Sequence, residues 1–303
     1  MQTIIRRNPY RTKPHQGRSA RKATPAGSAH LLAVAALLAS QAVSGAAFAA
    51  GRGPGVFLED MTTNEVRAKL DAGCPVGIIF SAGGEQTGPH VVLGKHIFRA
   101  RAYGEAIARN LGDAIVAPVQ PFAPNSSPRG DPHAAFAGSI GISTQTFIAL
   151  NEEIARSLVD GGFRRVALLG DHGNGQKELR TLAAKLDGEY AGRGVRVFFV
   201  GGGYDRARRQ IEAESMAAGI PAGGHGGLWD TAETLAAKPG SVRMKLLRAG
   251  DVSNGGNGRM NEEGFSGDPR RTTVALGKRY AAIRVRHATD ELRTYLKDAG
   301  PCR

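Results

Sequence analysis

The chain has 303 residues and a formal net charge of +13. This length is sufficient for one large α/β domain with a well-buried core. The first fifty residues carry seven Lys or Arg and no Asp or Glu, so the other residues hold 33 basic and 27 acidic side chains, a net charge of +6. Because much of the basic excess lies in the head of the chain, no basic face is indicated on the folded domain, and a nucleic-acid partner is not expected.

The head of the chain has the order of a secretory signal. A basic segment is followed by an apolar, alanine-rich run at Leu31 to Val43 and by Ala47-Phe48-Ala49, which fits a small-x-small cleavage site. The apolar run is too short for a membrane span. We expect residues 1–49 to be a signal peptide and residues 50–303 to be a single domain, periplasmic or secreted, with no stable membrane anchor after signal removal. The alternatives are a disordered basic tail or a start codon placed too early.

The rest of the chain alternates between apolar runs typical of buried strands and segments with helical spacing. Strands are predicted at residues 76–80, 114–119, 166–169 and 195–200. Helices are predicted to begin near Thr62, Ile97, Ser143, Leu179, Ala207, Ala232 (capped by Thr231) and Asp268. The segments 120–138 and 250–271 are rich in Gly, Pro, Ser or Asn, so we expect loops that border the pocket and move. The alternation predicts an α/β fold with a mostly parallel central sheet and helices on both faces.

Two glycine-rich turns that follow predicted strands carry residues suited to binding a metal. The first turn, residues 83–96, contains one glutamate and two histidines. The second turn, residues 170–176, contains Asp171 and His172. Active sites of open α/β sheets lie at the carboxyl ends of strands, so we expect the two turns to form one shared site. Carboxylate and imidazole ligands together suit zinc, manganese or iron(II).

At these turns the chain resembles the creatininase (creatinine amidohydrolase) family. The segment Glu85–His96 is similar to the family's Glu-x-His-Gly-x-His motif, and Gly170–Gly175 is similar to its Asn-Gly-His-Gly-Gly-Asn turn. The segment His133–Ser139 resembles the family's His-x-x-Phe-Pro-Gly-Thr, and the sequence around His225 resembles its His-Ala-Gly. The resemblance extends from about Val56 to Leu247.

The resemblance implies a three-layer αβα fold and a metal-dependent amidohydrolase, which the head of the chain predicts to be exported. Family members cleave amide C–N bonds, often cyclic or formamide-like, with metal-activated water, so the expected substrate is a small-molecule amide with a non-peptide C–N bond. A homo-oligomer is also implied. The alternative is a non-catalytic binding protein that keeps the scaffold and has lost the chemistry. A substrate-binding protein of a transporter would require two similar lobes, whereas the chain shows one alternating block.

The resemblance also implies that one metal ion, not two, is bound. In two-metal members one ion takes the motif's first Glu and the turn's His, which match Glu85 and His172. In this chain, the two positions that bind only the second ion are Thr87 and Asn174, and the position of the Asp that bridges both ions is His96. A neutral imidazole has one free nitrogen and does not bridge two ions as a carboxylate can. The implied metal ligands are therefore Glu85, His96 and His172, with Thr87 and Asn174 lining a space that binds substrate or water.

The remaining candidate residues are assigned with alternatives left open. His225, which lies among glycines that let a substrate approach the backbone, and Asp230 are expected to move protons or hold the substrate. Asp171 either caps the following helix or hydrogen-bonds a ligand. His90 either orients a metal ligand or packs within its turn. His133 either walls the site or is a surface residue of the long loop.

Two other kinds of site are excluded by missing motifs. The serine-containing turns lack Gly-x-Ser-x-Gly, which argues against a serine nucleophile. Cys74 and Cys302 lack the Cys-x-x-Cys spacing of a zinc site. An oxidising compartment would permit a bridge between them, but nothing in the sequence brings them together, so we expect a buried Cys74 and a free Cys302.

Overall fold

A parallel sheet of four strands lies at the centre of the structure, a computed structural model that describes residues 55–125 and 136–302. The strands are β1 (Val76–Ser81), β2 (Ala114–Val116), β3 (Arg165–Gly170) and β4 (Arg196–Phe199). Their order is β2-β1-β3-β4, and every pair of neighbours is parallel. The continuous apolar runs predicted these strands because a parallel sheet is buried on both faces. The predicted signal peptide at residues 1–49 and His133 lie outside the described residues.

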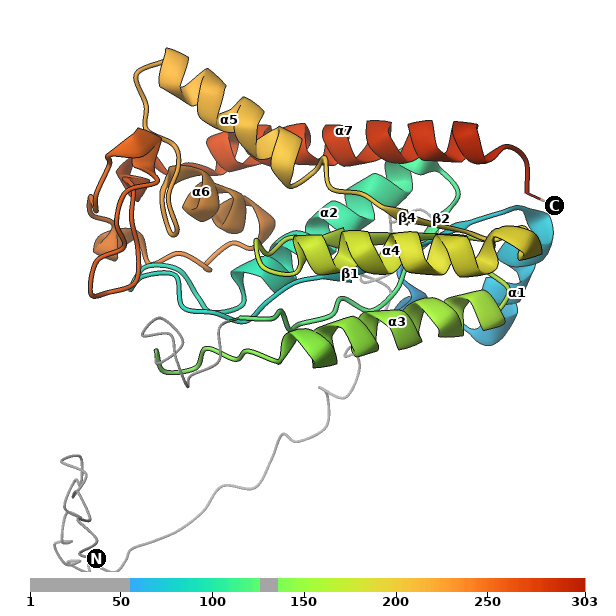
Figure 1. Ribbon diagram of the computed structural model, residues 1–303. Helices are drawn as coiled ribbons and strands as arrows, with labels where there is room; N and C mark the ends of the chain where they lie inside the picture. Colours follow the sequence, from blue (N-terminus) through green and yellow to red (C-terminus); the bar gives the residue numbers. More distant parts are fainter. Residues whose placement is uncertain (1–54, 126–135, 303) are drawn as a thin grey trace, which may run out of the picture. The chain divides into compact units, whose positions relative to one another are not determined.

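Helices connect the strands and follow them (Figure 1). The α-helices are α1 (Thr63–Ala72), α2 (Lys95–Leu111), α3 (Thr144–Asp160), α4 (Gln176–Tyr190), α5 (Asp205–Ala217), α6 (Leu228–Ala237) and α7 (Val274–Ala299). Short 3-10 helices are η1 (Leu58–Asp60), η3 (Ala191–Arg193), η4 (Met244–Leu246), η5 (Asn254–Gly256) and η6 (Pro269–Arg271). Within the described ranges, no helix is long and apolar enough to cross a membrane.

The sheet is the middle of three layers. Side chains of β1 alternate between its two faces, because successive residues of a strand point to opposite sides. Ile78 packs on one side in the cluster that contains Tyr103 of α2 and Leu292 of α7. Ile79 packs on the other side with Phe147 of α3 and Leu182 of α4. Figure 1 shows α7 and α3 on opposite sides of the sheet. The predicted three-layer αβα architecture with a parallel sheet is confirmed.

A third cluster joins α5, α6 and the first half of α7. It includes Ile211 of α5, Trp229 of α6 and Tyr280 of α7. The two helices α6 and α7 approach so closely that a Cβ atom at Gly277 would overlap the carbonyl oxygen of Ala232. This packing places the beginning of α6 beside the cavity described below.

The boundaries of α6 and α7 differ from the prediction. Helix α6 begins at Leu228, so Thr231 lies inside the helix and does not cap it. The hydroxyl of Thr231 donates instead to the carbonyl oxygen of Gly226 at 2.9 Å. Asp268 caps only the 3-10 turn η6, and Thr273 caps α7. The Thr62 capping box of α1 is confirmed.

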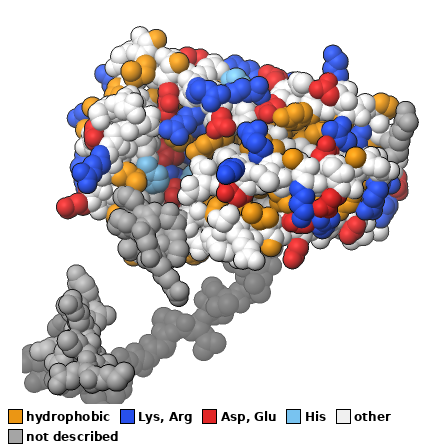
Figure 2. Space-filling model, in the orientation of Figure 1, with side chains coloured by type: hydrophobic (Ala, Val, Ile, Leu, Met, Phe, Trp, Pro, Cys, Tyr) orange, Lys and Arg blue, Asp and Glu red, His pale blue; other side chains and the backbone are white. Residues whose placement is uncertain are grey.

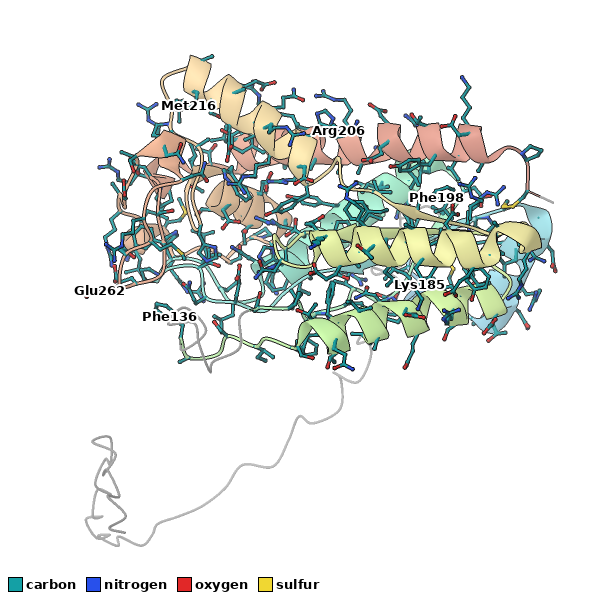
Figure 3. All side chains as sticks on the ribbon, in the orientation of Figure 1. Phe136, Lys185, Phe198, Arg206, Met216 and Glu262 are labelled. Atoms are coloured by element: carbon teal, nitrogen blue, oxygen red, sulfur yellow. A yellow bond between two sulfur atoms is a disulfide. The ribbon has the colours of Figure 1, made fainter. Side chains whose placement is uncertain are left out.

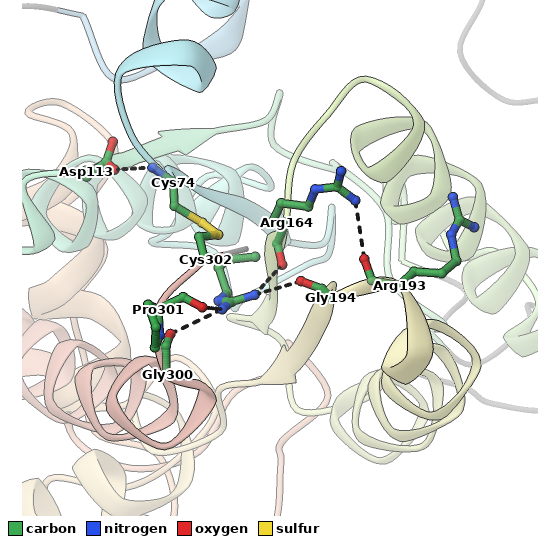
Figure 4. Close-up of a disulfide and its surroundings, with 9 residues drawn as sticks. Cys74, Asp113, Arg164, Arg193, Gly194, Gly300, Pro301 and Cys302 are labelled. Atoms are coloured by element: carbon green, nitrogen blue, oxygen red, sulfur yellow. Dashed lines mark hydrogen bonds between the residues drawn. A yellow bond between two sulfur atoms is a disulfide. The ribbon is translucent and has the colours of Figure 1, made fainter.

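Cys74 and Cys302 form a disulfide, so the expectation of a free Cys302 is wrong (Figures 3 and 4). Their Cα atoms lie 6.2 Å apart, within the usual range. The backbone N–H of Cys74 donates to Asp113 Oδ2 at 3.1 Å, and the Arg165 guanidinium donates to the carbonyl oxygen of Gly300 at 3.2 Å. The course of α7 returns the chain end to the beginning of β1, across a separation of 228 residues.

Candidate metal centre

The carboxyl ends of β1 and β3 bring the two glycine-rich turns together. The strands are neighbours in the sheet, and Ser81 pairs with Gly170 in the parallel register. Glu85 follows β1, His172 follows β3, and His96 lies in the first turn of α2. The shared site expected from the sequence is therefore formed at one edge of the sheet.

The side chains of Glu85, His96 and His172 converge. One ligand atom from each residue lies within 4.8 Å of the others. His96 Nε2 lies 2.9 Å from Glu85 Oε1, and His172 Nε2 lies 3.0 Å from Glu85 Oε2. These are the three predicted metal ligands, and the described part of the chain contains no other group of three His, Cys, Asp or Glu residues so arranged.

The hydrogen bonds of His96 leave one nitrogen free to bind a metal. Its Nδ1 lies 2.6 Å from Asp171 Oδ2 and donates its proton to that carboxylate. Burial and then the Lys95 ammonium lower the pKa of His96, so the ring is neutral and Nε2 presents a lone pair. This lone pair faces Glu85 Oε1, which is also an electron-pair donor. A cation between the two atoms satisfies both, so these residues fit a divalent metal ion.

Arg99 holds Asp171 behind His96. Arg99 is completely buried, and its Nε and Nη2 donate to Asp171 Oδ2 at 2.9 and 2.7 Å. Although burial raises the pKa of Asp171, the Arg99 guanidinium and the hydrogen bond from His96 outweigh burial and keep that pKa below its ordinary value. Of the two roles left open for Asp171, the structure shows contact with a ligand-type histidine, whereas Gly175 is the N-cap of α4. A carboxylate behind a histidine in this way orients metal-binding imidazoles.

The backbone of its own turn orients His172. Its Nδ1 lies 3.0 Å from the Asn174 nitrogen and 3.4 Å from the Asn174 carbonyl oxygen. In the neutral ring, Nδ1 either accepts from that N–H, which leaves the proton on Nε2, or donates to that carbonyl, which leaves Nε2 free. Metal binding through Nε2 requires the second tautomer. Asn174 is exposed and lines the cavity, and its contact with substrate or water stays a prediction.

A buried ion-pair network beside Glu85 was not predicted. Lys95 is 1% exposed, and its Nζ lies 2.7 Å from Asp230 Oδ2 and 3.2 Å from Glu85 Oε1. Arg99 Nη1 and the backbone N–H of Gly226 also donate to Asp230, at 2.5 and 2.9 Å. Burial raises the pKa of Asp230, but the Lys95 and Arg99 charges hold it well below its ordinary value. Asp230 is thus a carboxylate paired with two cations, and its predicted role in moving protons or holding the substrate stays a prediction.

His225 reaches the cavity from the turn that precedes α6. Its Nε2 donates to the Gln86 carbonyl oxygen at 2.8 Å, so its Nδ1 is unprotonated, 3.8 Å from Glu85 Oε1. The backbone N–H of Ser266 donates to the His225 carbonyl oxygen at 2.9 Å and holds the turn. Burial and then the Lys95 ammonium lower the pKa of His225 to about 4, so the ring is neutral at pH 7. The free Nδ1 can accept a proton from a water molecule in the cavity.

Thr87 and His90 lie behind the cavity wall, and both are completely buried. His90 Nε2 donates to the Gly226 carbonyl oxygen at 2.9 Å, so His90 supports the turn before α6 and does not touch a metal ligand. The Thr87 hydroxyl has no hydrogen-bond partner among the described residues. The predicted space lined by Thr87 and Asn174 is therefore not formed, because only Asn174 reaches the cavity.

The cavity has a volume of about 440 Å³, within the range of small-molecule sites. Figure 2 shows histidine and acidic side chains together in a hollow of this face. Its wall includes four residues of the loop 250–271, namely Asn257, Gly258, Met260 and Ser266. Figure 3 places Glu262 of this loop at the same end of the molecule as Met216 of α5. Segment 250–271 therefore borders the pocket as expected, whereas its motion remains a prediction.

Comparison with known proteins agrees with this geometry. The model of the family described as "Creatininase: Creatinine amidohydrolase" matches residues 59–292. The chain is 26% identical over 246 residues to the mycofactocin precursor peptide peptidase of Mycolicibacterium smegmatis, which covers 76% of this chain and 89% of that protein.

Solved structures show the same fold. One titled "Creatininase Mn" aligns with a TM-score of 0.63 and 21% identity over 80% of this chain and 99% of that chain. A putative creatinine amidohydrolase from Bacteroides fragilis aligns with a TM-score of 0.59 and 18% identity over 78% and 94% of the two chains. Because the family model matches well over half of the sequence, the chain belongs to the creatininase family.

Proposed function

We propose that the protein is an exported amidohydrolase that cleaves an amide C–N bond with metal-activated water, using one zinc, manganese or iron(II) ion per chain. The observation that carries this proposal is the convergence of one carboxylate and two imidazoles, from Glu85, His96 and His172, at the cavity. Two structural relatives support the choice of a transition metal, since one is titled with Mn and the other is described as "Zn-Zn type".

The residues around the cavity divide the chemistry between them. A divalent ion held by Glu85, His96 and His172 would lower the pKa of a water molecule and polarise the substrate carbonyl. Neutral His225, whose Nδ1 is unprotonated, would accept a proton from a water molecule in the cavity and would donate it to the leaving nitrogen. Asp230 holds Lys95 in place through an ion pair.

The proposed substrate is a small-molecule amide, whose size suits the cavity. One structural relative was solved in complex with creatine, which is a small molecule. The end of a peptide is the second candidate, because the relative from Mycolicibacterium smegmatis is named for a precursor peptide.

A metal-dependent assay tests this function. Protein loaded with zinc, manganese or iron(II) is incubated with cyclic amides, formamides and short peptides, and the released carboxylate and amine are followed by NMR. We expect hydrolysis that disappears on chelation and in Glu85→Gln, and that persists in Glu105→Gln, which alters only an exposed helical ion pair. Protein that holds no metal and shows no gain in melting temperature with these ions would favour a non-catalytic binding protein.

We also propose export to an oxidising compartment. Its support is the order of charged, apolar and small residues in the head of the chain, together with the Cys74–Cys302 disulfide, since such bridges persist in oxidising compartments. Intact-mass measurement of protein recovered from periplasm or medium should show that residues up to about Ala49 are absent. A mass that includes Met1 would contradict export with cleavage of the signal peptide.

Assembly as a homo-oligomer is proposed from the family resemblance alone. Light scattering measures the molar mass in solution and so tests it.

A further inference from the structure

We propose that the Lys95 ammonium occupies a second cation site, formed by Glu85, Asp230 and His225, and thereby limits the centre to one divalent ion. The inference rests on the proposed metal centre and extends it from the ligands to a residue that competes for one of them. It predicts that the chain carries a latent site for a second divalent cation, which removal of the Lys95 side chain would open.

The first observation is the burial and pairing of Lys95. Lysine is rarely buried unless its charge is paired, and here only 1% of the residue is exposed. Its Nζ lies 2.7 Å from Asp230 Oδ2 and 3.2 Å from Glu85 Oε1. Two carboxylate groups therefore face this one ammonium. The ammonium is thus a fixed cation within the centre.

The second observation is the set of donor atoms near Nζ. Two carboxylate oxygens come from Glu85 and Asp230. His225 adds Nδ1, 3.8 Å from the same Glu85 oxygen and unprotonated because Nε2 donates to Gln86. Two carboxylates and one imidazole are ligands that zinc, manganese and iron(II) accept. All of these residues line the cavity, so an ion from solvent can reach the position of Nζ.

The third observation is that one oxygen serves both positions. Glu85 Oε1 lies 2.9 Å from His96 Nε2 on the side of the proposed metal and 3.2 Å from Lys95 Nζ on the other side. A carboxylate has about four lone-pair sites and can bridge two cations. Because an ammonium already fills one of the two positions, a single position remains for a divalent ion.

The surroundings allow Lys95 to be removed without loss of the fold. Asp230 keeps two partners, since Arg99 Nη1 still donates to Oδ1 and the Gly226 N–H still donates to Oδ2. These bonds continue to anchor α6 beside α2. A Lys95→Ala variant therefore leaves space and two carboxylates at the former position of the ammonium, while Lys95→Arg retains a cation there.

Metal stoichiometry tests the proposal without measuring activity. Wild type, Lys95→Ala and Lys95→Arg are dialysed against zinc or manganese, freed of unbound ions and analysed for metal per chain. We expect one equivalent in wild type, two in Lys95→Ala and one in Lys95→Arg. Adding Asp230→Asn to Lys95→Ala should return the value to one, because one ligand of the second position is lost.

The outcomes separate this inference from the proposed function. One equivalent in both wild type and Lys95→Ala, each with a cooperative melting transition, overturns the second site and leaves the metal centre standing. No metal in wild type overturns the proposed function and this inference with it. Should Lys95→Ala fail to fold, Lys95→Met is the second variant, because methionine fills a similar volume without a charge. The Lys95→Met protein should bind its one ion at least roughly tenfold more tightly in chelator competition, because the repelling charge is gone. An unchanged affinity would overturn the proposal.

Discussion

Each proposed metal ligand is held by a different kind of partner. The carboxylate of Asp171 holds His96, the backbone of Asn174 holds His172, and an ammonium holds Glu85. Each partner fixes the donor atom of its ligand before a metal binds. Loss of the partner of either histidine should therefore weaken metal binding while the fold survives.

Asp171→Asn tests the partner of His96. The amide is a weaker acceptor for the Nδ1 proton, so the ring is less basic and less well oriented. We expect metal affinity to fall about 10- to 100-fold, measured by competition with a chelator. Glu105→Gln, at an exposed pair with Arg109, is the control and should bind metal as wild type does. Wild-type affinity in Asp171→Asn would show that this contact does not support the metal ligand.

Asp230 should make the stability of the protein depend on pH. Its pKa in the folded state lies well below the ordinary value of 3.8, so in acid the unfolded chain binds more protons. The contribution is complete above that ordinary value and is lost as the pH falls toward the folded-state pKa. Asp230→Asn should lower the free energy of unfolding by about 3–5 kcal/mol at pH 7, and the difference should narrow below about pH 4. Urea titrations at pH 7, 5 and 3 measure it, and a constant difference would count against this role.

Sequence patterns located the metal-ligand candidates but missed the groups that hold them. Glycine-rich turns after buried strands marked Glu85 and His172, because strand ends at one sheet edge lie together. No sequence pattern indicated that Lys95 is buried, since lysine is ordinarily exposed and its partner Asp230 is 135 residues away. The two roles of His90 stayed open because a motif orders residues along the chain and does not say which side of a turn faces the cavity; the structure shows the buried packing role.

At the scale of elements, two helices place charged side chains beside the carboxyl ends of the strands. The first two turns of α2 supply Lys95, His96 and Arg99, and the first turns of α6 supply Asp230 and Glu233. Helix α6 is held in turn by α7, through the close approach at Gly277. The position of the charged cluster thus depends on how closely α6 and α7 pack.

Gly277→Ala should disturb this packing. The added methyl group would overlap the carbonyl oxygen of Ala232, so the two helices must separate. We expect the free energy of unfolding to fall by about 1–3 kcal/mol, measured by denaturant titration. Gly188→Ala in α4 is the matched control, since no atom lies within 4 Å of the added carbon. That variant should be neutral or slightly more stable, and equal effects of the two variants would contradict the packing argument.

The strands and most helices were predictable because local patterns determine them, whereas the start of α6 was not. Continuous apolar runs mark the strands of a parallel sheet buried on both faces. Helix α6 begins at Leu228 directly after a run of glycines, without a side-chain cap. A cap was therefore sought at Thr231, which the structure places inside the helix. Burial of Leu228 and Trp229 against α5 and α7 overrides the missing cap signal.

At the scale of the whole domain, one covalent link joins distant parts of the chain. The Cys74–Cys302 disulfide connects the residues just before β1 to the residues just after α7. Arg165 in β3 also binds the carbonyl oxygen of Gly300, so the end of the chain is tied to the central sheet twice. The link should restrict the unfolded chain strongly, because the loop it closes spans 228 residues.

Reduction of this disulfide should lower the free energy of unfolding by about 2–5 kcal/mol. Denaturant titrations with and without a reductant measure the difference in wild type. In Cys74→Ser, which cannot form the bridge, the reductant should have no effect. Equal stability of oxidised and reduced wild type would show that the link contributes nothing to the fold.

The number of metal ions per chain tests the proposed centre most directly. Elemental analysis of protein purified without added metal should give one equivalent of zinc, manganese or iron in wild type. His96→Ala should lose it, because one of three ligands is gone. The control His287→Ala alters a histidine that contacts Gln210 on α5 and should keep one equivalent. Two equivalents in wild type, or one retained undiminished in His96→Ala, would contradict a single metal held by Glu85, His96 and His172.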